Sequence, residues 1–175
     1  MQLGSKTLRC SNEACQVCEL DARLLAAGAE RVAWSDLHEH SCHLYVQLQS
    51  DHRCPYGLRL DIDKAEYRNP TGGDQSRMCD FAVMAAIRDT AVLVVVELKS
   101  GVAYAGEVEQ LSEGLRVLHE LFEQNGLNPE PKAYWVVGRE IDKLRFAMRD
   151  RLASLRFGLM PVQLLILECS DTVYR

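Results

Sequence analysis

The chain lacks a long apolar run. Its 175 residues contain no uncharged apolar stretch of about 18 residues, the length expected of a membrane-spanning helix. The first residues, MQLGSKTLRCSNEAC, are polar and lack the apolar segment of a signal peptide. We therefore expect a protein without a membrane span, located in the cytoplasm. With 47% hydrophobic residues, the chain can still form a core, so we expect a single domain over residues 1–175.

The chain also lacks an excess of positive charge. Its formal net charge is −5, which excludes the general attraction to polyanions shown by a free-standing basic nucleic-acid-binding protein. Any such binding must be local. The best candidate, residues 139–156, holds six basic residues against three acidic ones. A phosphate-contacting face and the solvated face of a helix explain this excess equally well.

Cysteine is not scarce, but the chain has seven cysteines, an odd number that does not suit a complete set of disulfides. In a reducing compartment we expect thiols, which leaves metal binding, reactivity or packing as their roles. Cys10, Cys15 and Cys18 form a C-x4-C-x2-C run that could hold structural Zn²⁺ or an iron–sulfur cluster. Because Cys15 and Cys18 have helical spacing on one core face, we favour buried thiols.

The hydrophobic pattern predicts helices that alternate with strands. We expect helices over residues 11–29, 104–124 and 141–156, and strands within residues 43–49, 56–63, 78–87, 91–100, 132–137 and 162–168. The segment NPTGGD at residues 69–74 is a predicted loop. This order predicts an α/β domain of three layers, with a central mixed β-sheet and helices on both of its faces.

Three charged residues stand at the ends of two neighbouring apolar segments, MCDFAVMAAI and AVLVVVELKS. Asp80 lies near the start of the first segment, and Glu97 and Lys99 close the second. If the segments form a hairpin centred on Arg88 and Asp89, residues whose numbers sum to 177 face each other. Asp80 then lies directly opposite Glu97, and Lys99 takes the next position on the same face. A divalent cation is the usual compensation for such a buried acidic pair.

These residue types fit metal-assisted hydrolysis. Asp80 and Glu97 would bind one or two Mg²⁺ ions that activate a water, while Lys99 orients the water or stabilises developing phosphate charge. The ordinary alternative is that Glu97 and Lys99 are solvated residues at a strand end. Three histidines also lie close together in sequence, and we interpret them as a surface cluster rather than as acid–base catalysts: His38, His40 and His43.

The pattern D-x16-E-x-K across a hairpin resembles the PD-(D/E)XK nuclease superfamily, whose fold is called restriction-endonuclease-like. The resemblance covers residues 78–118 by motif, and it implies that Asp80 and Glu97 are metal ligands and Lys99 the catalytic lysine. It also implies an active-site role for Gln110, since several branches carry a helix glutamine there. Gly114 follows, where close packing would explain a glycine inside a helix. Cys79 stands where the family name has proline.

Some members of the superfamily also take a metal-site glutamate from the first helix. Glu13 and Glu19 are available here, and nothing in the sequence selects either.

The resulting hypothesis is a DNA nuclease that depends on Mg²⁺ or Mn²⁺ and acts in defence or DNA repair. The acidic net charge suggests that it works as a homo-oligomer or with a protein partner that supplies DNA affinity. Two alternatives stay open: a non-catalytic interaction subunit with the same fold, and a metal-dependent hydrolase of RNA or nucleotides.

Overall fold

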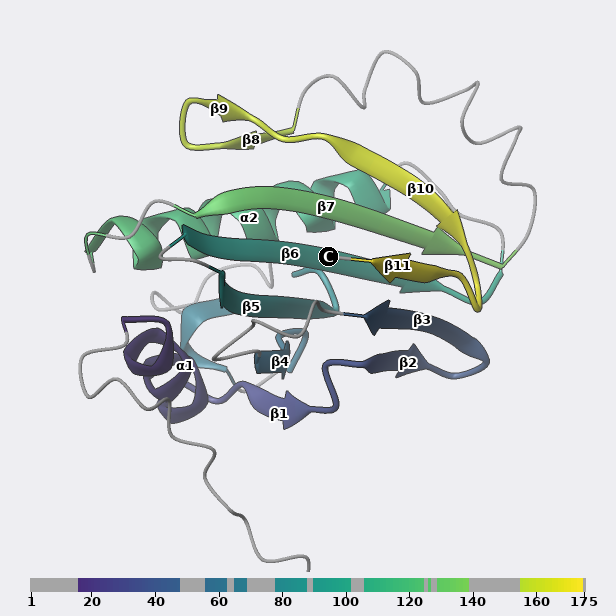
Figure 1. The fold of residues 1–175 in the computed structure, drawn as a ribbon, viewed down its shortest axis with the longest axis horizontal. Helices are drawn as coiled ribbons and strands as arrows, with labels where there is room; N and C mark the ends of the chain where they lie inside the picture. The colour runs from purple at the N-terminus through teal and green to yellow at the C-terminus, as the bar shows by residue number, and fades with distance from the viewer. Residues whose placement is uncertain are drawn as a thin grey trace, which may run out of the picture.

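A six-stranded mixed sheet forms the centre of the fold (Figure 1). The computed structural model describes residues 16–47, 56–62, 65–68, 78–87, 90–101, 106–124, 126, 129–138 and 155–174. In spatial order the strands of this sheet are β1 (Glu30–Val32), β4 (Tyr56–Arg59), β5 (Phe81–Ile87), β6 (Thr90–Lys99), β7 (Glu130–Val137) and β10 (Leu164–Glu168). Neighbours from β1 to β6 are antiparallel, whereas β6, β7 and β10 run parallel.

The strands β5 and β6 form the predicted hairpin in the predicted register. Phe81 pairs with Val96 and Ile87 with Thr90, so every pair sums to 177. Both strands are apolar on both faces because each face of the sheet is covered by another layer. A shift of the register by one residue would turn every side chain to the opposite face, so the packing of the two cores fixes the register. The prediction from the sequence is confirmed here.

Two described helices cover one face of the sheet. These are α1 (Gln16–Ala26) and α2 (Gly106–Gln124), and their apolar residues join Ala82, Met84, Leu93 and Val95 in one core cluster. The helix α2 connects β6 to the parallel strand β7, as a crossover requires. It ends at Gln124, two residues before Gly126, whose φ of 66° suits a glycine after a helix end.

The opposite face is covered by a second sheet, which corrects our expectation of helices on both faces. This sheet has three strands in the order β11 (Thr172–Tyr174), β3 (Cys42–Gln47) and β2 (Asp36–Glu39). Its residues Leu37, Leu44 and Val46 pack against Phe81 and Val94 in a second core cluster. The described layers are therefore helices, sheet and sheet. The predicted loop over residues 69–74 and most of the helix predicted over residues 141–156 lie outside the described residues. The last two residues of that prediction are not helical, since Leu155 has no regular structure and Arg156 begins β8.

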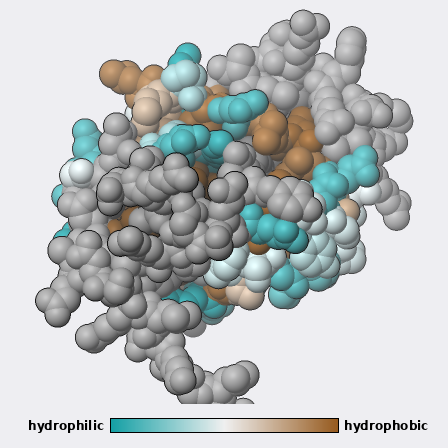
Figure 2. All heavy atoms as spheres, viewed as in Figure 1, coloured by the Kyte–Doolittle hydropathy of each residue, from teal (hydrophilic) through white to brown (hydrophobic). Residues whose placement is uncertain are grey.

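Shorter elements complete the described chain: the 3₁₀ helix η1 (Glu66–Arg68) and a hairpin of β8 (Arg156–Phe157) and β9 (Met160–Pro161). The hairpin packs on α2 through Phe157, whose ring makes an edge contact with His119 at 4.9 Å between centroids. Figure 2 shows a visible face in which polar and apolar residues are mixed. Among the described residues, no helix has the length and apolar character to cross a membrane.

The cysteines differ from the expectation that all are thiols. Cys42 and Cys169 form a disulfide that joins the start of β3 to the residue after β10. Their sequence separation is 127 residues, so no local spacing pattern could reveal the pair. Cys79 is a fully buried free thiol. Cys10 and Cys15 lie outside the described residues, and Cys18 is half-buried on α1.

Gly114 lies where α2 packs closely against Cys79, two residues before β5. A Cβ atom at this position would lie 2.3 Å from Cys79 Sγ and 3.3 Å from Cys79 Cβ. We expect Gly114→Ala to lower the free energy of unfolding by about 1–2 kcal/mol, because overpacking outweighs the better helix propensity of alanine. Chemical denaturation measures this change.

The matched control is Ser112→Ala, at an exposed position of the same helix, which should change stability by less than about 0.5 kcal/mol. The double variant Gly114→Ala/Cys79→Ala removes the clashing sulfur and should recover part of the loss. An unchanged Gly114→Ala stability would contradict the close approach.

Candidate functional site

Asp80 and Glu97 lie opposite each other at one end of the β5–β6 hairpin, as predicted. The pair Phe81 and Val96 closes the strand ladder, and Asp80 and Glu97 are the next two facing residues. The Leu98 backbone N–H donates a hydrogen bond to Asp80 Oδ2 at 2.7 Å, and the Asp80 backbone N–H donates to the Glu97 carboxylate. The Asp80 carbonyl in turn accepts from the Leu60 N–H at 2.8 Å. Both carboxyls are thus fixed by the sheet itself.

Burial dominates the electrostatics of this pair. Asp80 is 5% exposed and Glu97 is 2% exposed. Desolvation raises the pKa of Asp80 to about 8, and the nearby acids Glu39 and Asp61 act in the same direction. Desolvation followed by the charge of Asp80 raises the pKa of Glu97 to about 10. Such a pair either holds a proton or needs a cation.

Lys99 lies on the same rim, with its side chain 43% exposed. Its Nζ is 3.4 Å from Oε1 of Glu107, a buried residue in the first turn of α2. Glu107 was not predicted as a site residue. The ion pair holds the Lys99 ammonium against the first turn of α2.

Gln110 also reaches this site from α2. Its Nε2 donates to the Met78 carbonyl at 3.3 Å, so the amide supports the backbone just before Asp80. The predicted active-site role of Gln110 stays a prediction. The contact itself explains how the helix and the start of β5 are held together.

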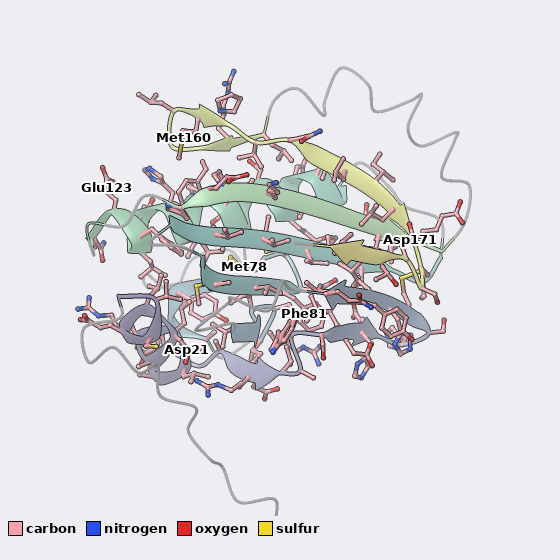
Figure 3. All side chains as sticks on the ribbon, viewed as in Figure 1. Asp21, Met78, Phe81, Glu123, Met160 and Asp171 are labelled. Carbon is pink, nitrogen blue, oxygen red and sulfur yellow. A yellow bond between two sulfur atoms is a disulfide. The ribbon has the colours of Figure 1, made fainter. Side chains whose placement is uncertain are left out.

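These residues line one cavity of about 480 Å³. Figure 3 labels Met78 and Phe81, which bracket Asp80 at the start of β5. The cavity is polar and receives side chains from both sheets and from α2: Glu39, His40, Asp61, Met78, Asp80, Glu97, Leu98, Lys99, Ser100 and Gln110. All four predicted site residues, Asp80, Glu97, Lys99 and Gln110, are therefore brought together.

Two further acids in the cavity were missed by the sequence analysis. Glu39 ends β2, and Asp61 lies two residues after the end of β4. Their carboxylate oxygens and one of Asp80 all lie within 4.8 Å of one another. Asp61 carried a weak signal, since it ends the alternating run L-R-L-D and β4 pairs with β5. Glu39 carried none, because it belongs to a sheet that the sequence did not predict.

The residues present fit a divalent cation. Oε2 of Glu97 is buried and has no hydrogen-bond partner among the described residues. A buried carboxylate oxygen without a donor is costly, and Mg²⁺ or Mn²⁺ prefers oxygen ligands of this kind. Asp80 and Glu97 are the side chains that would hold the cation.

Other candidates lie away from the cavity. On α1, Glu19 is exposed and pairs with Arg23 at 2.7 Å, while Glu13 lies outside the described residues. The buried acid of that helix is Asp21, labelled in Figure 3, which pairs with Arg31. On the outer face of β2 and β3, ligand atoms of three residues approach within 4.8 Å of one another: Asp36, His38 and His43. Neither group of potential ligands found in the described residues contains a cysteine.

Comparison with known proteins does not assign the chain to a family. No family model, curated protein or solved structure gives a significant match to this chain. The geometry of the cavity therefore carries the functional argument.

Proposed function

We propose that the chain is a metal-dependent nuclease that hydrolyses DNA phosphodiester bonds at the cavity formed by Asp80, Glu97 and Lys99. The observation that carries this proposal is the facing pair Asp80–Glu97, which is almost fully buried in a cavity that Lys99 also lines. One carboxylate oxygen of Glu97 has no hydrogen-bond partner within the described part of the chain. The helix-first order and the mixed sheet fit the restriction-endonuclease-like fold that the resemblance implies.

Each side chain has a defined task in this proposal. When bound, Mg²⁺ or Mn²⁺ supplies Lewis-acid activation of the phosphodiester and of an attacking water. Asp80 and Glu97 hold the cation, and the backbone N–H groups of Leu98 and Asp80 keep their carboxylates in place. Lys99 provides positive charge for the phosphate oxygens as negative charge develops on them.

The proposed partners follow from charge. Because the chain is acidic overall, we propose that a homo-oligomer or a protein partner supplies part of the DNA affinity. Of the six basic residues within 139–156, five lie outside the described residues and Arg156 lies within them. The cytoplasmic location stays a prediction, and the Cys42–Cys169 disulfide weighs against a strongly reducing compartment.

Cleavage assays test the proposal. Plasmid, linear duplex and single-stranded DNA are incubated with wild-type protein in Mg²⁺, Mn²⁺ or EDTA. We expect cleavage that needs the cation, and a loss of about 10²–10³-fold in rate for Lys99→Met, the magnitude of removing one preorganised charge donor. Lys132→Met is the matched control, because Lys132 pairs with Glu130 at 3.1 Å and does not line the cavity.

Equal cleavage by Lys99→Met and the wild type would refute the assigned site. Cleavage of RNA or nucleotides but not of DNA would favour the alternative hydrolase. No cleavage of any substrate would favour the interaction subunit.

A further inference from the structure

We propose that Asp36, His38 and His43 form a Zn²⁺ site on the outer face of the covering sheet, with two imidazole nitrogens and one carboxylate oxygen as ligands. None of these residues lines the cavity that contains Asp80 and Glu97. The site therefore goes beyond the proposed nuclease and does not depend on it. It also contains none of the cysteines that were considered for structural Zn²⁺.

The strand register places the three side chains on one face of the sheet. In β2, Leu37 is fully buried, so its neighbours Asp36 and His38 point to the outer face. In β3, the buried Leu44 directs its neighbour His43 outward in the same way. His38 and His43 pair directly across the two strands, and their rings stack with centroids 5.3 Å apart. A metal bound by both rings would join β2 to β3.

The spacing of the ligand atoms suits a tetrahedral Zn²⁺ ion. One ligand atom from each residue lies within 4.8 Å of the other two. Asp36 Oδ1 and His43 Nδ1 are 3.1 Å apart. Two tetrahedral ligands at the usual Zn–N and Zn–O lengths are about 3.3–3.5 Å apart. Zn²⁺ would take the place of the proton that these two atoms share, and the proton would leave to solvent. The His38 ring is exposed and free to make the remaining adjustment of roughly 1–1.5 Å.

The donor types favour Zn²⁺ over Mg²⁺ at this position. Imidazole nitrogen suits Zn²⁺, Cu²⁺ and Ni²⁺, whereas Mg²⁺ and Mn²⁺ prefer oxygen ligands such as those of the cavity. Three protein ligands leave a fourth tetrahedral position for water. The side chains of Asp36 and His43 are 43% and 34% exposed, so the metal and this water reach the site directly from solvent. The outer face and the cavity therefore differ in the metal that they prefer.

The backbone beneath the site is held on both strands. The Ser170 N–H donates to the His43 carbonyl at 2.7 Å, and the adjacent Cys42 is bound in the disulfide. The Asp36 N–H donates to the Ala33 carbonyl at 3.1 Å. Ligands on strands that are fixed in this way need little reordering when a metal binds, which lowers the entropic cost of binding.

A Zn²⁺ titration followed by NMR of the histidine ring nitrogens tests the inference without an activity assay. In the full-length chain, the ring signals of His38 and His43 should shift together with one dissociation constant. The ring of His119, which packs on Phe157, should not shift. Mg²⁺ alone should leave all of these rings unchanged. The same titration of Glu97→Gln, which lacks a ligand proposed for the cavity cation, should give the same dissociation constant.

Single substitutions test the individual ligands. His38→Gln and Asp36→Asn should each weaken Zn²⁺ binding by about tenfold or more, measured on the ring of His43. The matched control is His40→Asn, which replaces a histidine two residues from His38 that lines the cavity instead. Asparagine tolerates the positive φ of this position. This control should leave the dissociation constant of the outer site unchanged.

Three results would overturn the site. The first is that the rings of His38 and His43 do not shift in a large excess of Zn²⁺ over the chain. The second is that His40 shifts with the same dissociation constant, which would mean unspecific binding to exposed imidazoles. The third is unchanged affinity in both His38→Gln and Asp36→Asn. The first two results come from the wild-type chain, so they hold even where a variant fails to fold, and DNA cleavage does not affect them.

Discussion

In buffer without divalent cations, Glu97→Gln is expected to unfold at a higher temperature than the wild type, and the difference should widen between pH 6 and pH 8.5. Glutamine nearly preserves the shape of the side chain and carries no charge. It therefore removes the ionisation that burial opposes at this position, where Glu97 is 2% exposed.

The sign of the pH dependence follows from the raised pKa. In the unfolded chain Glu97 titrates near its ordinary value, whereas burial and the charge of Asp80 raise its pKa to about 10 in the fold. Across that interval the folded state holds a proton that the unfolded state has released. The free energy of unfolding of the wild type therefore falls as the pH rises toward the folded-state pKa. Glutamine does not titrate, so the free energy of unfolding of Glu97→Gln lacks this pH-dependent decrease.

The expected gain of Glu97→Gln over the wild type grows by roughly 2–3 kcal/mol from pH 6 to 8.5, somewhat less than the limit of about 1.4 kcal/mol per pH unit. Mg²⁺ should reverse the order, because it stabilises the wild type and has little to bind in the variant. Thermal unfolding at several pH values, with and without Mg²⁺, measures both effects.

Glu123→Gln provides the control for this comparison. Glu123 is exposed and lies sixteen residues beyond Glu107 on α2, roughly 24 Å along the helix at 1.5 Å per residue, at the position labelled in Figure 3. Its replacement should follow the wild type at every pH. A Glu97→Gln variant that loses stability with pH as steeply as the wild type would show that Glu97 is not held in a desolvated state.

The β5–β6 hairpin could be predicted from the sequence because its pairing register depends on local features alone. Two apolar strands with a short connection have few possible registers, and only the register that sums to 177 puts Asp80 opposite Glu97 at the rim. The helical spacing of α2 placed Gln110 and Gly114 on the side that faces β5 for the same reason. Local periodicity thus predicted the centre of the site.

The covering sheet could not be predicted in this way. The strands β2 and β3 pair from Asp36↔Tyr45 to Glu39↔Cys42, which leaves His40 and Ser41 as the turn. Two-residue hairpin turns favour Asn-Gly or Asp-Gly, because their residues adopt positive φ. His40 adopts a φ of 51° although histidine is not glycine, so the usual turn signal was absent. Glu39 was missed together with the hairpin that presents it.

Reduction of the Cys42–Cys169 disulfide is expected to lower the free energy of unfolding by about 2–5 kcal/mol, which corresponds to roughly 5–15 °C in Tm for a chain of this size. The bond closes a loop of 127 residues in sequence, and a long loop restricts the unfolded chain strongly. The disulfide also ties the covering sheet to the end of β10, so its loss weakens the contact between the two sheets.

The same disulfide lies next to the candidate site. Cys42 pairs directly with Glu39 across β2 and β3, and Cys169 Sγ lies 3.9 Å from the Lys99 carbonyl oxygen. Reduction should therefore lower the affinity for divalent cations as well as the stability, because Glu39 loses its fixed position. This second effect depends on the place of Glu39 in the cavity beside Asp80, whereas the effect on stability does not.

Thermal unfolding with and without a phosphine reductant measures how much of the stability depends on the disulfide. The unfolding temperature of the wild type should fall on reduction. The unfolding temperature of Cys42→Ala/Cys169→Ala should be low in both buffers and should not change when the reductant is added. Cys79→Ala is the matched control, because Cys79 is a buried thiol on β5's side of the core and its removal should leave the response to reductant intact. A wild type that unfolds at the same temperature in both buffers would mean that the two sheets are held by their apolar contacts alone.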